Sequence, residues 1–228
     1  MESNIEVFLS RPKKVLLFLS IWLPGKRHLF LHYLIRTIVM ISQYSFLLFE
    51  LIFIGVVWGD IDEVSEASYL LFTQASVCYK ATVFIVNKQN LTKLLDFMMI
   101  EEFAPQSKIH HEILSRNAQK VKNLCLVFLV SAITTCSLWA IMPWFDEAET
   151  RSFPFKIWMP LSPHEYLQYA TGYLYQVLSV YTSATLFFSV DSTTLSMLMF
   201  GCAQLEIIID KITMVTIEFM RIITITTI

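Results

Sequence analysis

Apolar residues in this chain gather into long runs that charged residues rarely interrupt. The run at 166–190, YLQYATGYLYQVLSVYTSATLFFSV, holds twenty-five residues without a charge. Three further runs of similar character lie at 34–58, 67–86 and 124–144. About 20 largely apolar residues, each rising about 1.5 Å along a helix, cross the hydrocarbon core of a bilayer. The pattern therefore predicts four membrane-spanning helices.

The segments between and after these runs are predicted to continue them as helix. The first two runs are separated only by a short acidic turn, which predicts an antiparallel hairpin. Residues 91–122 are charged but keep apolar positions at helical spacing. After Asp191 the pattern of the fourth run continues through 191–211, and 212–228 form an atypical Ile- and Thr-rich tail. We therefore expect one all-α transmembrane domain, residues 1–228, with helices two to four extended into the cytosol.

The N-terminal segment resembles a signal peptide only in part. A basic cluster at Arg11, Lys13 and Lys14 precedes nine apolar residues from Val15, which are too few to span a bilayer. Lys26 then stands where a small-residue cleavage site would be needed. A short interfacial or packed helix before the first crossing is predicted.

Composition agrees with a membrane protein and narrows the function. Hydrophobic residues make up 55% of the chain, charged residues 16%, and the mean hydropathy is +0.57; soluble domains carry about 25% charge. The net charge of −2 is unclustered, so we expect no nucleic-acid partner. The sequence has no phosphate-binding loop, nucleophile elbow or metal-ligand spacing. No enzyme activity, cofactor or metal is predicted.

The distribution of positive charge predicts the orientation. The N-terminal segment carries five Lys and Arg residues, the first turn none, the segment after the second crossing six, and the loop before the fourth run two. Positive charge stays on the cytoplasmic side. We therefore expect a multi-pass plasma-membrane protein with a cytosolic N-terminus, in contact with membrane lipid. Trp58, Trp139, Trp144 and Trp158 then fall on the outer side, as an interfacial aromatic belt would.

Tyr169, Tyr173, Gln176 and Val180 form one helical stripe in the fourth run, and three of the four carry a polar group. Such a face suits a cavity that binds a small apolar molecule, with aromatic walls and a few polar groups. It suits helix–helix packing equally well, because both kinds of face have the same period. Both interpretations stay open at this point.

One carboxylate, Glu50, falls inside the first run, and buried ionisable groups in membranes are functional hypotheses by default. Lys80 is a conceivable partner, but by depth it lies about 8 Å further toward the inner side. A protonated or water-linked Glu50 is therefore favoured over an ion pair.

Several segments resemble the insect odorant receptor family. They are FPFKIWMPLSPHEY at 153–166 with the Tyr- and Gln-bearing run after it, VDSTTL and CAQLEI within 190–207, and KQNLTKLLDFM at 88–98. The resemblance covers roughly residues 1–210. It implies a seven-helix receptor with a cytosolic N-terminus that joins a shared co-receptor in a tetrameric, ligand-gated cation channel of sensory neurons. The odorant site would lie in the outer half of the bundle, between helices two, three, four and six.

The family has three further helices, including the one that lines the pore, whereas this sequence stops at Ile228. The chain is therefore expected to be a C-terminally truncated member, with part of the odorant pocket and none of the gate. Two alternatives remain: a taste-type receptor, which shares helices and orientation, and a transporter fragment. The second would need an inverted repeat or helices broken by Gly and Pro, and neither is visible.

Depth along the four runs defines an expected odorant pocket and a lid above it. The lid comprises Trp158 and Pro160 in the loop before the fourth run, since proline stiffens the backbone and tryptophan anchors at the interface. Tyr173 is the strongest candidate, as an aromatic wall with a polar tip. The expected pocket residues are Phe72, Thr73, Ser76, Thr135, Trp139, Tyr169, Tyr173, Gln176 and Val180.

Overall fold

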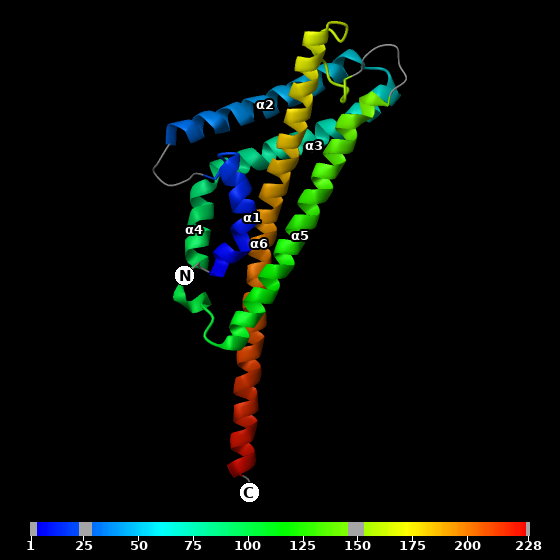
Figure 1. The fold of residues 1–228 in the computed structure, drawn as a ribbon. Coiled ribbons are helices and arrows are strands. Elements are labelled where there is room, and N and C mark those ends of the chain that lie inside the picture. Colours follow the sequence, from blue (N-terminus) through cyan, green and yellow to red (C-terminus); the bar gives the residue numbers. More distant parts are fainter. Residues whose placement is uncertain (1–3, 23–28, 146–152, 227–228) are drawn as a thin grey trace.

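A computed structural model describes residues 4–22, 29–145 and 153–226, and all its regular elements are helices (Figure 1). The α2, α3 and α6 helices, and α5 together with η2, are each long and apolar enough to cross a membrane. The prediction of an all-α membrane protein is therefore confirmed. The elements are α1 (Asn4–Phe18), α2 (Leu29–Val56), α3 (Ile61–Val86), α4 (Lys88–Met98), η1 (Glu101–Phe103), α5 (Lys108–Ile141), η2 (Met142–Trp144) and α6 (Tyr166–Thr226).

The short N-terminal helix α1 packs against α6. Phe8 and Phe200 are both 1% exposed, and their rings meet edge to face at 5.6 Å between centroids. Ser196 Oγ also donates a hydrogen bond to the carbonyl of Phe8 at 3.1 Å. Lys26, where a cleavage site would have been needed, lies outside the described residues.

The turn between α2 and α3 follows from its sequence. Gly59 adopts a φ of +112°, a left-handed conformation that glycine permits without strain. The carboxylate of Asp60 then caps α3, accepting hydrogen bonds from the backbone N–H groups of Asp62 at 3.1 Å and Glu63 at 3.2 Å. In Figure 1 this hairpin is strongly inclined to the α5–α6 pair.

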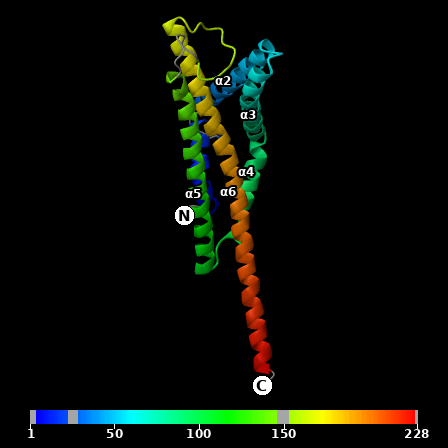
Figure 2. The same ribbon diagram turned by 90° about the vertical axis from the view of Figure 1, so that its right-hand side faces the viewer.

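The fourth predicted run is the start of a continuous helix, α6, of 61 residues. It contains no proline and continues beyond Asp191 without a break. Figure 2 shows its C-terminal part projecting past all the other described elements, and side chains from Lys211 to Ile225 are exposed there.

A buried polar network joins α2, α3 and α6. Gln74 Nε2 donates to Gln43 Oε1 at 2.9 Å, and Ser183 Oγ donates to Gln74 Oε1 at 2.7 Å. Gln43 Nε2 in turn donates to the carbonyl of Ser179 at 3.2 Å. Unsatisfied polar groups are costly inside a membrane, so mutual bonding explains how α6 tolerates hydroxyls here. For Ser179 and Ser183 the polar side chains serve helix packing.

Candidate ligand cavity

The segment 153–165, which precedes α6, folds back onto the end of the helix bundle that contains the α2–α3 turn, η2 and the start of α6. We call this the outer end, after the orientation that the sequence predicts, and the opposite end the inner end. Phe155 and Ile157 are only 5% and 7% exposed and pack with Phe46 of α2 in one apolar cluster. The ring of Phe155 meets the ring of Phe46 edge to face, at 6.5 Å between centroids. Two loop side chains therefore fill space that helix side chains leave open.

Backbone and charged contacts hold this loop in place. The N–H of Phe155 donates to Gln176 Oε1 at 2.9 Å, and the N–H of Trp158 donates to the carbonyl of Phe49 at 3.3 Å. The ammonium of Lys156 lies 2.7 Å from Glu66 and 3.1 Å from Glu63, both on α3. Hydrogen bonds to Glu66 and then Glu63 raise the pKa of Lys156.

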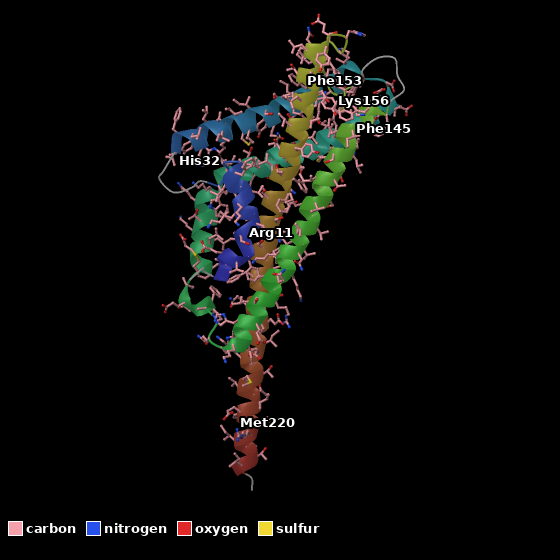
Figure 3. All side chains as sticks on the ribbon, in the orientation of Figure 1. Arg11, His32, Phe145, Phe153, Lys156 and Met220 are labelled. Atoms are coloured by element: carbon pink, nitrogen blue, oxygen red, sulfur yellow. The ribbon has the colours of Figure 1, made fainter. Side chains whose placement is uncertain are left out.

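A cavity of about 610 Å³ lies between this loop, the outer part of α3 and the outer end of α5 with η2. The ring of Trp139 stacks on the ring of Phe155, at 5.6 Å between centroids with the planes 8° apart. The ring of Tyr69, on α3, also lies 5.6 Å from the ring of Trp139. Figure 3 shows Phe145, Phe153 and Lys156 together at this end of the molecule. The lining residues are Glu66, Ala67, Tyr69, Leu70, Trp139, Met142, Pro143, Phe145, Phe153, Pro154, Phe155, Lys156 and Ile157.

The chemistry of this cavity is aromatic and apolar, with few polar groups. Glu66 and Lys156 neutralise each other at its edge. The hydroxyl of Tyr69 makes no hydrogen bond to another described residue, and Tyr69 is 44% exposed. An apolar site with few available hydrogen-bonding groups can hold a small, largely hydrocarbon molecule and orient it. Among the described residues, no cluster of metal-ligating side chains is present.

Of the predicted pocket residues, Trp139 lines the cavity directly. Tyr169 lies behind it, stacked at 5.5 Å on Phe153, and the Tyr173 hydroxyl donates to the carbonyl of Ala140 on α5. Gln176 is fully buried and bound to Phe155, while Val180 packs against the Phe46–Phe155–Ile157 cluster. These α6 residues support the cavity wall rather than form its surface.

Other predicted pocket residues are directed elsewhere. Phe72 is 71% exposed on α3. Thr73 and Thr135 are also exposed, and their hydroxyls bond back to carbonyls of their own helices at 2.8 and 2.9 Å. Ser76 is half-buried and does not line the cavity. These residues lie at a suitable depth for the predicted pocket. Depth, however, does not determine toward which side of its helix a side chain points.

Sequence reasoning missed Tyr69, Phe155 and Ile157. The signal for the loop residues is the alternation FPFKIW at 153–158, where apolar side chains at every second position are directed inward. Of the predicted lid residues, Trp158 contacts Phe49 at 5.9 Å between ring centroids and remains 39% exposed. Pro160 is exposed at the surface of the same loop.

Glu50 and Lys80 do not pair with each other. Lys80 Nζ lies 2.9 Å from both carboxylate oxygens of Asp191 and 4.0 Å from the ring centroid of Phe187. Glu50 is 2% exposed, and its carboxylate oxygens have no hydrogen-bond partner among the described residues. Gln176 Nε2 is likewise unpartnered there. The α2–α6 region beside the loop thus contains buried polar groups whose bonding is incomplete within the described chain.

The fold and cavity together define a class: a multi-pass, all-helical membrane protein with an aromatic site at one end. The sequence profile of the family described as "7tm Odorant receptor" matches residues 60–218. The chain therefore belongs to the odorant receptor family, a family of receptors rather than enzymes.

Two individual proteins support this assignment. Odorant receptor Or1 of Anopheles gambiae is 27% identical over 134 residues, which cover 58% of this chain and 32% of that receptor. The solved structure of the olfactory receptor OR5 of Machilis hrabei superposes with a TM-score of 0.74 at 13% identity, covering 87% of this chain and 55% of that one. The second similarity concerns the fold alone. The chain thus spans about a third and about half of these two proteins.

Proposed function

We propose that this chain is an odorant receptor subunit that binds small, volatile, mostly apolar molecules in the cavity between α3, α5 and the 153–157 loop. The observation that carries the proposal is the aromatic wall formed by Trp139, Phe155 and Tyr69 around about 610 Å³ of space. Membership of a family of odorant receptors supports the same ligand class.

The energetics suit such ligands. A volatile molecule offers few polar atoms, so its affinity comes from burying carbon against apolar walls, at about 25 cal/mol per Å². Discrimination between ligands then falls to the few polar groups that the wall provides. Tyr69 is the group we assign to this role, since its hydroxyl has no described partner.

We further propose the arrangement of the receptor in the cell. The charge distribution supports a cytosolic N-terminus in the plasma membrane, with the cavity at the extracellular side. In the complete receptor the subunit would join a shared co-receptor in a ligand-gated cation channel, by analogy with the family. The described helices would supply the ligand-binding part of that assembly.

The experiment uses residues 1–211 joined to the remaining helices of a related full-length receptor and expressed with its co-receptor. Trp139→Ala should raise the odorant concentration for half-maximal current about tenfold or more, because one face of the aromatic wall is lost. Currents evoked by a co-receptor agonist should not change. Phe72→Ala is the matched control, since Phe72 is a large aromatic residue of α3 that is 71% exposed and does not line the cavity.

The prediction for Tyr173 provides a second comparison. Tyr173→Ala should shift odorant potency through the wall that it supports, again with co-receptor agonist currents intact. If Trp139→Ala leaves odorant potency unchanged while Phe72→Ala alters it, the cavity is not the odorant site. If every variant abolishes both responses together, the residues act in folding and the proposal fails.

A further inference from the structure

Helix α6 contains glycine at two interior positions, Gly172 and Gly201. After proline, glycine is the residue that favours a helix interior least, because it leaves the unfolded backbone the most freedom. A glycine there often marks a place where another segment comes too close for a side chain. A Cβ atom added at Gly201 would meet nothing within 4 Å, whereas one added at Gly172 would overlap its neighbours. Only Gly172 is therefore explained by a close approach.

The atoms that approach Gly172 belong to the 153–165 loop. A Cβ atom at this position would lie 2.7 Å from Cε1 and 3.0 Å from Cζ of Phe153, and 2.8 Å from Cε of Met159. Carbon atoms pack best at about 3.5–4.0 Å, so these neighbours would have to move. Met159 ends in a flexible chain that can turn aside. The ring of Phe153 is rigid and has to move as a whole.

The surroundings of Phe153 determine where its ring can go. The ring stacks on Tyr169 at 5.5 Å between centroids, and it also lines the cavity of about 610 Å³. Two residues further along, the loop backbone is fixed to α6, because the N–H of Phe155 donates to Gln176 Oε1 at 2.9 Å. With the backbone held there, a ring displaced from Gly172 moves away from α6 and into the space that it borders. That space is the cavity.

We infer that Gly172 determines the length of the ligand that the cavity accepts, because its missing side chain lets the Phe153 ring lie back against α6. The inference rests on the proposed function of this cavity and adds the ligand property that is selected there. Gly172 does not itself line the cavity, so it is a positioning residue that acts through Phe153. In an apolar pocket, one methylene too many changes binding roughly 10- to 200-fold.

The test measures how the purified full chain, in detergent, binds straight-chain primary alcohols from butanol to decanol. A ligand that binds only the folded protein raises its melting temperature, and the dependence on alcohol concentration gives the Kd. Gly172→Ala should weaken binding of the longest alcohol that the unmodified chain accepts by about tenfold or more. The shortest alcohols should bind as before, since they do not need the space that the ring now fills.

Gly201→Ala is the matched control, because it makes the same change in the same helix with the same gain in helix propensity and without a neighbour within 4 Å. It should leave the preference for alcohol length unchanged. Gly172→Ala combined with Phe153→Leu should restore binding of the long alcohols, since leucine lacks the Cε1 and Cζ atoms that meet the new methyl group. A purely structural role would change the melting temperature without ligand but not the length preference.

The same length preference in Gly172→Ala and Gly201→Ala would overturn the inference. An equal loss for all alcohols that Phe153→Leu does not restore would also overturn it, as would tighter binding of the long alcohols, which would mean that the loop lifts away instead. Trp139→Ala shows whether the proposed function itself fails, because it would then bind every alcohol as the unmodified chain does. If Trp139→Ala weakens binding and Gly172→Ala does not alter the length preference, this inference alone is wrong.

Discussion

The two ends of the α5–α6 pair are packed in different ways. At the inner end thirteen buried residues from α1, α4, α5 and α6 form one apolar core, which includes Phe8, Val121 and Phe200. At the outer end the corresponding cluster has three fully buried members, Phe46, Phe155 and Ile157, and two of these come from a loop. A cavity of about 610 Å³ adjoins the second cluster, and a hollow of about 530 Å³ borders the first through Ile5, Leu9 and Leu95.

This difference separates the part that holds the helices together from the part that can accommodate a ligand. Close packing resists any change of volume, because interiors have few voids and respond to the loss of a single methylene. A wall made partly by a loop, through two backbone hydrogen bonds and one lysine, can adapt with little disturbance of the helices. The smaller, loop-built cluster of the outer end suits the ligand binding that we propose there, and the larger core of the inner end suits a stabilising role.

The largest expected effect concerns which end faces the outside. Asn90-Leu91-Thr92 is an acceptor sequence for N-linked glycosylation, and Asn90 is exposed on α4 at the inner end. With a cytosolic N-terminus, the chain made in microsomes should carry no glycan at Asn90. A glycosidase-sensitive mobility shift that disappears in Asn90→Gln would reverse the orientation and place the cavity on the cytosolic side.

Truncating a core ring should distinguish the two ends by stability. Phe200→Ala should cost about 3–5 kcal/mol, because the ring is 1% exposed and the space it leaves cannot collapse. Phe155→Ala should cost less than half of that, since its ring already borders a cavity. Both stability losses can be measured by thermal unfolding in detergent, with size-exclusion chromatography as the readout of the folded fraction. Equal losses would mean that the loop cluster is as rigid as the inner core.

The lid can be tested by removing its indole. Trp158→Ala deletes the contact with Phe49, so the loop should close less firmly over the outer end. We expect a change of about threefold in the odorant concentration for half-maximal response of the complete receptor, or a reduced surface level, corresponding to less than 1 kcal/mol. Trp58→Ala is the control, because Trp58 is 78% exposed in the α2–α3 turn. Unchanged dose–response and surface level would remove the lid.

The smallest effect is the response of the inner end to acid. A hydrogen bond from Asn117, assisted by Arg116, lowers the pKa of Glu206 below its ordinary 4.5. A carboxyl whose pKa is lower in the folded state contributes stability above its unfolded pKa, and this is lost as pH falls through the folded value. The melting temperature should therefore decline below about pH 4.5. Glu206→Gln should flatten this part of the profile slightly, and an unchanged profile would contradict the assignment.

Much of the fold could be predicted from the sequence, because membrane-spanning helices can be recognised from the length and apolar composition of a run of residues. The twenty-five uncharged residues at 166–190 allow few structures other than a buried or membrane helix. The acidic turn at Asp60 likewise indicated a hairpin, since a carboxylate there can cap the next helix. The short N-terminal apolar run required packing, and its residues Leu16, Leu19 and Ile21 pack with Val77 of α3 and Leu186 of α6.

The candidate cavity was harder to predict, because it depends on helix rotation and on the path of a loop. Phe72 and Trp139 were chosen for the same depth, yet only Trp139 is directed at the loop. The polar residues on α6 could not be assigned to packing or to a pocket from the sequence, because both kinds of face have the same helical period. In the structure Ser183 bonds to another helix, whereas Gln176 binds the loop. Lys80 pairs with Asp191 rather than with Glu50. The sequence pattern does not indicate which of the two acids lies closer to Lys80 in space.

The unbroken course of α6 has a mechanical consequence. Gln176, which holds the loop, and Glu206, which is bonded to α5, lie thirty residues apart on one rod, or about 45 Å. Because α6 contains no proline, a common cause of sharp kinks, we expect it to tilt or rotate largely as a unit. The contacts at the two positions are therefore mechanically coupled. A slight shift at Gln176 strains the contact at Glu206, and whatever fixes Glu206 limits how far the loop can move.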